Sequence, residues 1–228
     1  MSVHPADSKM SGELWGTSEM RALFSDASHL QLMLDVEAAL ARAEARLGLV
    51  PRQVAQAITK AARIENLAME RIAEGTRDAG VPVPALVREL NRAAGEEAAR
   101  YIHLGASTQD ILDTALMLQI RRALEHLRRD LVALARALAK RASDYRDTPM
   151  AGRTHLQQAV PITFGFKCAV WASPLAAHIE RLDQAARRVL VVQFGGAAGT
   201  LAALGANGVA VTEALAHELG LGVPDLPW

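Results

Sequence analysis

A long segment with a seven-residue hydrophobic period constrains the fold of this chain more than any other feature. Its apolar residues recur in alternating steps of four and three: Ile120, Leu124, Leu127, Leu131, Leu134 and Leu138. This spacing places them on one seam of a helix, as in the long helices of bundles. The pattern predicts a helix from about Gln109 to about Ser143, which spans roughly 50 Å at 1.5 Å per residue. Such a rod needs apolar partners along its whole length.

A second long segment repeats this period. Its apolar residues also step by four and three: Leu175, Ile179, Leu182, Ala186 and Val189. We expect Pro161 in the first turn of this helix, because proline is tolerated where an N–H group needs no partner. Two long seams with too few helices to bury them predict that the chain associates with copies of itself.

Shorter helices are predicted before residue 103. The first has one apolar stripe: Met33, Val36, Leu40, Ala43 and Leu47. Further on, Val81–Pro84 is expected to be an extended loop, because alternating prolines disfavour a helix interior. The sequence therefore predicts an all-α fold with a small helical N-terminal domain, residues 1–103, and a bundle of long helices, residues 104–228.

The composition excludes several classes of partner. Among 228 residues, 25 Lys and Arg balance 25 Asp and Glu, so no overall field attracts nucleic acid or an anionic membrane. The sequence contains no apolar run of about 18 residues, which is the length needed to span a membrane.

The chain contains a single cysteine, Cys168, so it cannot form an internal disulfide. This suits a reducing compartment such as the cytoplasm, and we expect Cys168 to be buried. Because the chain stops at Leu226–Trp228 in an apparent loop, we expect a fragment of a longer polypeptide.

A small polar cluster precedes the first long helix. Ser107, Thr108, Gln109 and Asp110 stand at its predicted start. Hydroxyl groups and unpaired N–H groups at a helix N-terminus suit a substrate carboxylate. The same residues also fit an ordinary helix cap, with Ser107 capping and Asp110 completing it. Both interpretations can hold together, and the adjacent His103 could enter such a site.

A second polar cluster lies in the turn between the two long helices. It contains Arg153, Thr154, His155 and Gln157. A histidine can accept or relay a proton near neutral pH, and an arginine can hold a carboxylate with two hydrogen bonds. A histidine that is simply hydrogen-bonded in a loop is the competing interpretation. A third, glycine-rich segment, Gly195–Thr200, lacks the Lys-Ser/Thr pair of a phosphate-binding loop.

These segments, in this order, resemble the fumarase/aspartase superfamily. The resemblance is carried by HLGASTQDILDT at 103–114, GRTHLQQAVPITFG at 152–165 and QFGGAAGT at 193–200. The run from Met20 to Pro51 and the terminal LGVPDLPW are more similar to the 3-carboxy-cis,cis-muconate cycloisomerase branch.

The resemblance implies a long-helix bundle of the fumarase/aspartase type, assembled as a homotetramer whose active sites are shared between subunits. It implies a small polycarboxylate substrate, a carbanion-like intermediate, and neither a cofactor nor a metal. Carried onto this sequence, the resemblance implies that Ser107, Thr108 and Gln109 bind a carboxylate and that Gln157 lies near Thr154 and His155. Thr154 and His155 would position the substrate and relay a proton.

Two departures keep alternatives open. The superfamily's third signature, of the SSxMPxKxNP type, supplies a serine implicated in catalysis, and nothing here matches it. Some members of the cycloisomerase branch carry a bulky aromatic residue where this chain has His155, whereas the lyases carry histidine. The alternatives are a cycloisomerase acting on a sulfonated muconate, an adenylosuccinate-lyase-like enzyme, and a non-catalytic helical assembly module.

Overall fold

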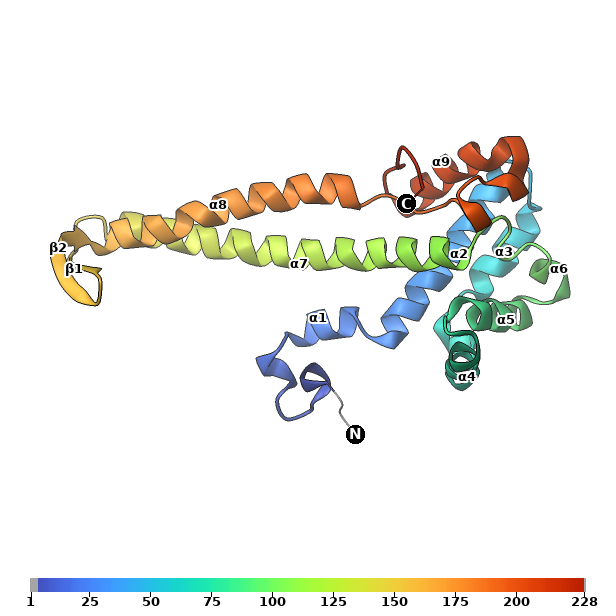
Figure 1. Ribbon diagram of the computed structural model, residues 1–228, viewed down its shortest axis with the longest axis horizontal. Coiled ribbons are helices and arrows are strands. Elements are labelled where there is room, and N and C mark those ends of the chain that lie inside the picture. Colours follow the sequence, from blue (N-terminus) through green and yellow to red (C-terminus); the bar gives the residue numbers. More distant parts are fainter. Residues whose placement is uncertain (1–3, 228) are drawn as a thin grey trace. The chain divides into compact units, whose positions relative to one another are not determined.

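The chain forms a helical protein with one two-stranded hairpin (Figure 1). The computed structural model describes residues 4–227, so the last residue of the predicted terminal loop, Trp228, lies outside the described part. Two compact units are present. The first comprises residues 1–121 and 189–228, and the second residues 122–188. Within residues 4–227, no helix combines the length and apolarity needed to cross a membrane.

The first unit is built around α2, Asp26–Arg46. The Ser25 hydroxyl caps this helix by accepting from the N–H of Ser28 at 3.3 Å, and the predicted apolar stripe is buried as far as Ala43. The other α-helices assigned wholly to this unit are α1 (Ser18–Leu23), α3 (Arg52–Ala61), α4 (Met69–Ala79), α5 (Val83–Ala94), α6 (Glu96–Ala99) and α9 (Gly208–Leu219). Short 3-10 turns fill the connections: η1 (Pro5–Asp7), η2 (Gly12–Leu14), η3 (Ile64–Asn66), η4 (Gly196–Ala198) and η5 (Ala202–Asn207).

The prediction that Val81–Pro84 is an extended loop is wrong. Helix α5 begins at Val83, and Pro82 is its N-cap residue with φ −78° and ψ −29°. Pro84 lies in the first turn, where a missing N–H breaks no hydrogen bond. Val83 is buried, so packing in the core accompanies this early start.

Helix α7, Thr108–Asp144, confirms the long predicted helix. Its 37 residues span about 55 Å at 1.5 Å per residue. Its first turns belong to the first unit and the remainder to the second. The two units therefore divide the chain differently from the predicted domains, 1–103 and 104–228, which remain a prediction.

The second unit joins the later part of α7 to α8, Phe164–Val189, through an antiparallel hairpin. Strand β1 is Pro149–Thr154 and strand β2 is Gln157–Thr163. The prediction that Pro161 begins a helix is wrong, because Pro161 lies in β2 opposite Ala151 and α8 begins three residues later. The polar turn is thus the end of a hairpin within an otherwise all-α fold.

Helix α8 packs closely on the end of α7 at Gly165. A Cβ atom on Gly165 would lie 2.5 Å from the carbonyl oxygen of Ala142 and 2.7 Å from that of Tyr145. The rings of Tyr145 and Phe164 meet edge to face at 5.3 Å between centroids. Nearby, Cys168 is buried, as predicted.

Candidate active site

Ser107 and Asp110 cap the start of α7 reciprocally. The Ser107 N–H donates to Asp110 Oδ2 at 2.8 Å, and the Asp110 N–H donates to the Ser107 hydroxyl at 3.3 Å. This is a capping box with aspartate in place of the usual glutamate. The helix-cap interpretation of the cluster is confirmed.

The same carboxylate also binds the glycine-rich segment. Gly195 N–H donates to Asp110 Oδ1 and Gly196 N–H donates to Oδ2, both at 2.9 Å. One turn further along α7, the Thr114 hydroxyl accepts from Gln193 N–H and donates to Gln193 C=O, each at 2.9 Å. Two of the three sequence segments therefore meet at one place. The glycines allow the backbone of the third segment to approach the helix start closely.

Two backbone donors at this helix start remain open. Within residues 4–227, no acceptor is found for the N–H groups of Thr108 and Gln109. The Gln109 side chain turns away to donate to Asp113 at 2.7 Å. Open N–H groups and the positive end of the helix dipole favour an anion at this position. The cap and the anion cradle are therefore compatible. Asp110 accepts the hydrogen bond from the Ser107 N–H, and the N–H groups of Thr108 and Gln109 stay available to an anion.

His103 lies four residues before Ser107, in the left-handed backbone region with φ 63°. Its Nδ1 donates to Glu37 Oε1 at 2.6 Å. Burial disfavours the charged imidazole, but the hydrogen bond and the charge of Glu37, together with the charge of Asp110, raise its pKa above the ordinary value of 6.5. The imidazole of His103, just before the start of α7, is therefore protonated more readily than an ordinary histidine.

Glu37 was not found by sequence reasoning. It lies on α2 and is only 1% exposed. A signal was available, because Glu37 and Glu44 are seven residues apart, which places two acids on one face of the helix. A buried carboxylate at such a position needs a partner, and His103 is that partner.

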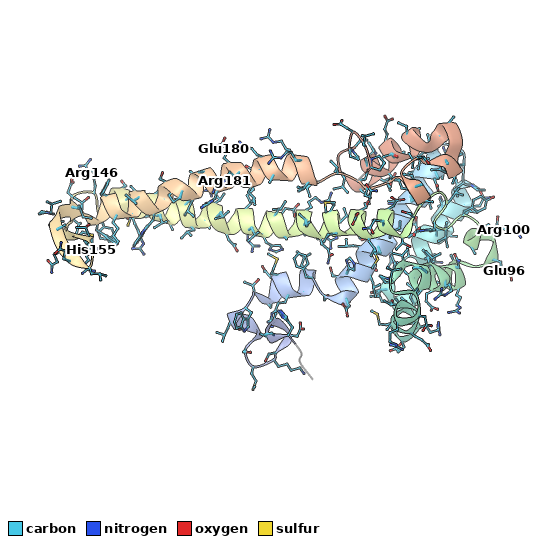
Figure 2. The ribbon with its side chains drawn as sticks, viewed as in Figure 1. Glu96, Arg100, Arg146, His155, Glu180 and Arg181 are labelled. Atoms are coloured by element: carbon cyan, nitrogen blue, oxygen red, sulfur yellow. The ribbon has the colours of Figure 1, made fainter. Side chains whose placement is uncertain are left out.

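The second polar cluster lies at the hairpin turn. His155 and Leu156 are the two loop residues between the strands, with φ 43° and 63°. Figure 2 shows His155 at the free end of the hairpin, and its side chain is exposed. Two successive non-glycine residues with positive φ cost on the order of 1 kcal/mol each. Backbone strain of this kind is often found at functional sites.

The other residues of this cluster flank the turn. Thr154 and Gln157 pair directly across the hairpin, and Arg153 is opposite Gln158 next to a bulge. The side chains of Arg153, Thr154 and Gln157 are all exposed. Sequence reasoning identified the turn but not its strands, because the segment lacks regular alternation of apolar and polar residues.

The predicted residues fall into two groups, one in each unit. His103, Ser107, Thr108 and Gln109 belong to the first unit, whereas Arg153–Gln157 belong to the second. Neither unit by itself holds the complete predicted set. Across residues 4–227, no group of three His, Cys, Asp or Glu side chains is placed to hold a metal ion.

Comparison with known proteins defines the class of this protein. The family described as "Lyase" matches residues 15–227. The chain therefore belongs to this lyase family, within the fumarase/aspartase superfamily.

Within the family, the chain is similar to 3-carboxy-cis,cis-muconate cycloisomerases. It is 52% identical to that enzyme of Pseudomonas aeruginosa over 92% of this chain and 46% of the relative. The crystal structure of the 3-carboxy-cis,cis-muconate lactonizing enzyme from Pseudomonas putida matches with a TM-score of 0.90 and 46% identity, over 93% of this chain and 49% of that one. Adenylosuccinate lyase of Methanocaldococcus jannaschii is 39% identical over 97% of this chain and 47% of the relative. The chain spans about half the length of the curated relatives it matches.

Proposed function

We propose that this chain is part of a cycloisomerase that converts 3-carboxy-cis,cis-muconate to a carboxymuconolactone, in the protocatechuate branch of aromatic catabolism. The observation that carries the proposal is the start of α7, where the amides of Thr108 and Gln109 have no acceptor and where His103, whose pKa is raised, lies four residues before the Ser107 cap. The identity to cycloisomerases over most of the chain supports the choice of substrate.

The reaction forms one C–O bond and one C–H bond. A carboxylate oxygen of the substrate bonds to an alkene carbon, and the displaced electron pair moves to the neighbouring carbon beside another carboxylate. That carbon then takes a proton, which completes the lactone. The intermediate adds negative charge to a substrate that is already polyanionic, so preorganised donors stabilise it by several kcal/mol.

The residues of this chain would divide that work. Thr108 and Gln109 amides, with Ser107 at the cap, bind a carboxylate, and His103 adds positive charge. Arg153 holds a second carboxylate, with Gln157 beside it. Thr154 and His155 position the reacting carbon and relay the proton.

The site is proposed to be shared between subunits of a homotetramer. Each group of residues belongs to a different unit of the chain. In a single chain the seam residues Leu127 and Leu134 are 47% and 50% exposed, and Trp171 on α8 is 49% exposed. Packing copies of this chain together would remove that apolar surface from water, which favours association. The single, buried Cys168 is consistent with work in the cytoplasm.

The substrate is tested with the full-length protein. Incubation with 3-carboxymuconate is expected to remove its conjugated-diene absorbance. Turnover of adenylosuccinate instead would assign a C–N or C–O lyase, for which the 39% identity to adenylosuccinate lyase is the supporting observation. Turnover of 3-sulfomuconate alone would assign the sulfonated substrate, and no turnover at all would favour a non-catalytic assembly module.

The role of the α7 start is tested by Thr108→Pro. Proline at the first helical position keeps the helix but removes the amide N–H. We expect kcat/KM to fall at least tenfold, which is about 1.4 kcal/mol in the barrier. Wild-type kinetics in this variant would contradict carboxylate binding at these amides.

A further inference from the structure

A groove between α2 and α3 concentrates positive charge away from the candidate-site residues. It has a volume of about 540 Å³, within the usual range for small-molecule pockets. Its charged lining consists of five cationic side chains and one carboxylate: Arg42, Arg46, Arg52, Lys60, Arg63 and Glu218. The chain as a whole has no net charge, so this excess is local.

Two of the five cations are held in place. Arg42 Nε is 2.7 Å from Glu218 Oε2, and Arg42 Nη1 donates to the Thr59 hydroxyl at 3.3 Å. Arg46 Nη2 is 3.3 Å from Glu218 Oε1 and donates to the Ala214 carbonyl at 2.8 Å. One carboxylate therefore orients two guanidinium groups without neutralising both, which lowers the entropy cost of binding an anion.

The other three cations are uncompensated. The side chains of Arg52, Lys60 and Arg63 form no hydrogen bond or ion pair within residues 4–227, and all three are exposed. Like charges gathered in a hollow repel one another, and an anion bound among them removes that repulsion. The three side chains are thus open donors in addition to the two that are oriented.

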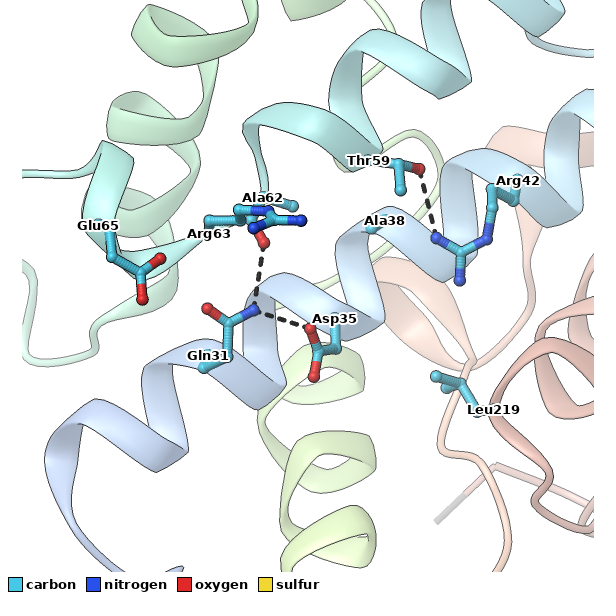
Figure 3. Close-up of a pocket in the computed structure, with 9 residues that line it drawn as sticks. All are labelled: Gln31, Asp35, Ala38, Arg42, Thr59, Ala62, Arg63, Glu65 and Leu219. Carbon is cyan, nitrogen blue, oxygen red and sulfur yellow. Dashed lines mark hydrogen bonds between the residues drawn. The ribbon is translucent and has the colours of Figure 1, made fainter.

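The adjoining hollow, drawn in Figure 3, shares Arg42, Thr59 and Arg63 with the groove. Figure 3 shows the guanidinium groups of Arg42 and Arg63 extending from opposite sides of this space. Gln31 on α2 holds the segment that carries Arg63, because its side chain donates to the Ala62 carbonyl at 3.1 Å and accepts from Ile64 N–H at 2.9 Å. Both neighbours of Arg63 in the sequence are therefore hydrogen-bonded to α2, the helix that carries Arg42.

From these observations we infer that the groove between α2 and α3 binds a small polyanion that carries two or more phosphate or carboxylate groups. Guanidinium groups bind both kinds of oxyanion with paired hydrogen bonds. A ligand with a single charge would leave most of the cationic lining uncompensated. None of the lining residues belongs to the candidate active site, so the groove is a second site, and this inference does not rest on the proposed function.

Isothermal titration of the full-length protein with inorganic pyrophosphate and with citrate tests the inference. Either anion is expected to bind saturably and to bind more weakly at higher salt concentration. Acetate, which carries a single charge, is not expected to bind saturably. If pyrophosphate binds more tightly, the ligand belongs to the phosphate class, and if citrate binds more tightly, it belongs to the carboxylate class. The double variant Arg52→Glu, Arg63→Glu is expected to weaken binding at least tenfold. The control Arg100→Glu, an exposed arginine on the same unit outside the groove, is expected to stay within about twofold of wild type.

Unchanged binding in the double variant, or no saturable binding of either anion, would overturn the inference. Binding of polyglutamate without binding of pyrophosphate or citrate would overturn it too, in favour of an acidic protein partner. Circular dichroism checks the fold of each variant. If the double variant is unfolded, the single changes Lys60→Gln and Arg52→Gln replace it, and affinity equal to wild type in both would contradict the inference.

Discussion

The imidazole of His103 and the carboxylate of Glu37 face each other with 2.6 Å between Nδ1 and Oε1. Glu37 comes from the centre of α2, whereas His103 lies just before the start of α7. The second carboxylate oxygen of Glu37 is buried without a hydrogen-bond partner. A buried carboxylate in that situation is stabilised by a cation, so the pair favours the protonated imidazole.

Replacing Glu37 by glutamine is therefore expected to lower the pKa of His103, because the main groups that raise it are removed. A titration of the His103 imidazole by NMR measures this directly. Because the pKa of His103 is raised in the folded protein, the His103–Glu37 pair stabilises the fold at low pH. The contribution of the pair is complete below pH 6.5, the ordinary value, and is lost as the pH rises through the folded pKa. The control is Glu96→Gln, an exposed glutamate, and an unchanged His103 titration in E37Q would contradict the account.

Asp110 is expected to be the most sensitive position of the helix start. Alanine there removes a cap and leaves the N–H groups of Ser107, Gly195 and Gly196 without their acceptor. We expect Asp110→Ala to lower the free energy of unfolding by about 2–4 kcal/mol, measured by urea denaturation. Asp130→Ala, on the exposed surface of the same helix, is the control and should change it by less than about 1 kcal/mol. Equal effects of the two changes would show that Asp110 does not hold the glycine-rich segment.

Glu44 predicts a pH dependence of stability. Its carboxyl group is fully buried and neither oxygen has a hydrogen-bond partner. Burial, and secondarily the charge of Glu37, raise its pKa from 4.5 to about 8. Because the folded pKa is raised, this residue destabilises the fold progressively as the pH rises from 4.5 to about 8.

Glutamine at position 44 cannot ionise, so Glu44→Gln is expected to remove most of this slope. The measurement is the free energy of unfolding at several values of pH between 4.5 and 8. The difference between variant and wild type should shift in favour of the variant by an amount on the order of a few kcal/mol across that range. Parallel curves would mean that Glu44 does not retain its proton in the folded protein.

Because Gly165 is closely packed, adding one methyl group at this position is expected to lower the stability of the protein. Alanine would place its Cβ within 2.5–2.7 Å of backbone atoms in the last turn of α7 and just beyond it. Backbone cannot move aside as a flexible side chain can, so Gly165→Ala is expected to destabilise the protein by about 1–3 kcal/mol. The matched control is Gly16→Ala, where the nearest heavy atom would be Arg21 Cγ at 3.6 Å. Thermal denaturation of the two variants compares them, and a stable G165A would mean that α7 and α8 pack less closely than described.

The long helices and the cap could be predicted because each rests on local physics. The four-three spacing along α7 and the Ser107–Asp110 pair need only a helix to explain them. The hairpin could not be predicted from the sequence. His155 and Leu156 adopt positive φ, but the turn lacks the glycine or asparagine that usually marks such turns. Glu37 was missed for a related reason: the partner of a buried charge is chosen by packing between segments 66 residues apart.

The central claim is that residues from two copies of this chain complete each site, and mixing two impaired variants tests it most directly. Thr108→Pro impairs the start of α7, and His155→Ala impairs the hairpin. Full-length copies of the two variants, unfolded and refolded together, are assayed with 3-carboxymuconate. If each site takes Thr108 and His155 from different subunits, random assembly should restore about a quarter of the wild-type turnover. Turnover no greater than the average of the two separate variants would contradict the account.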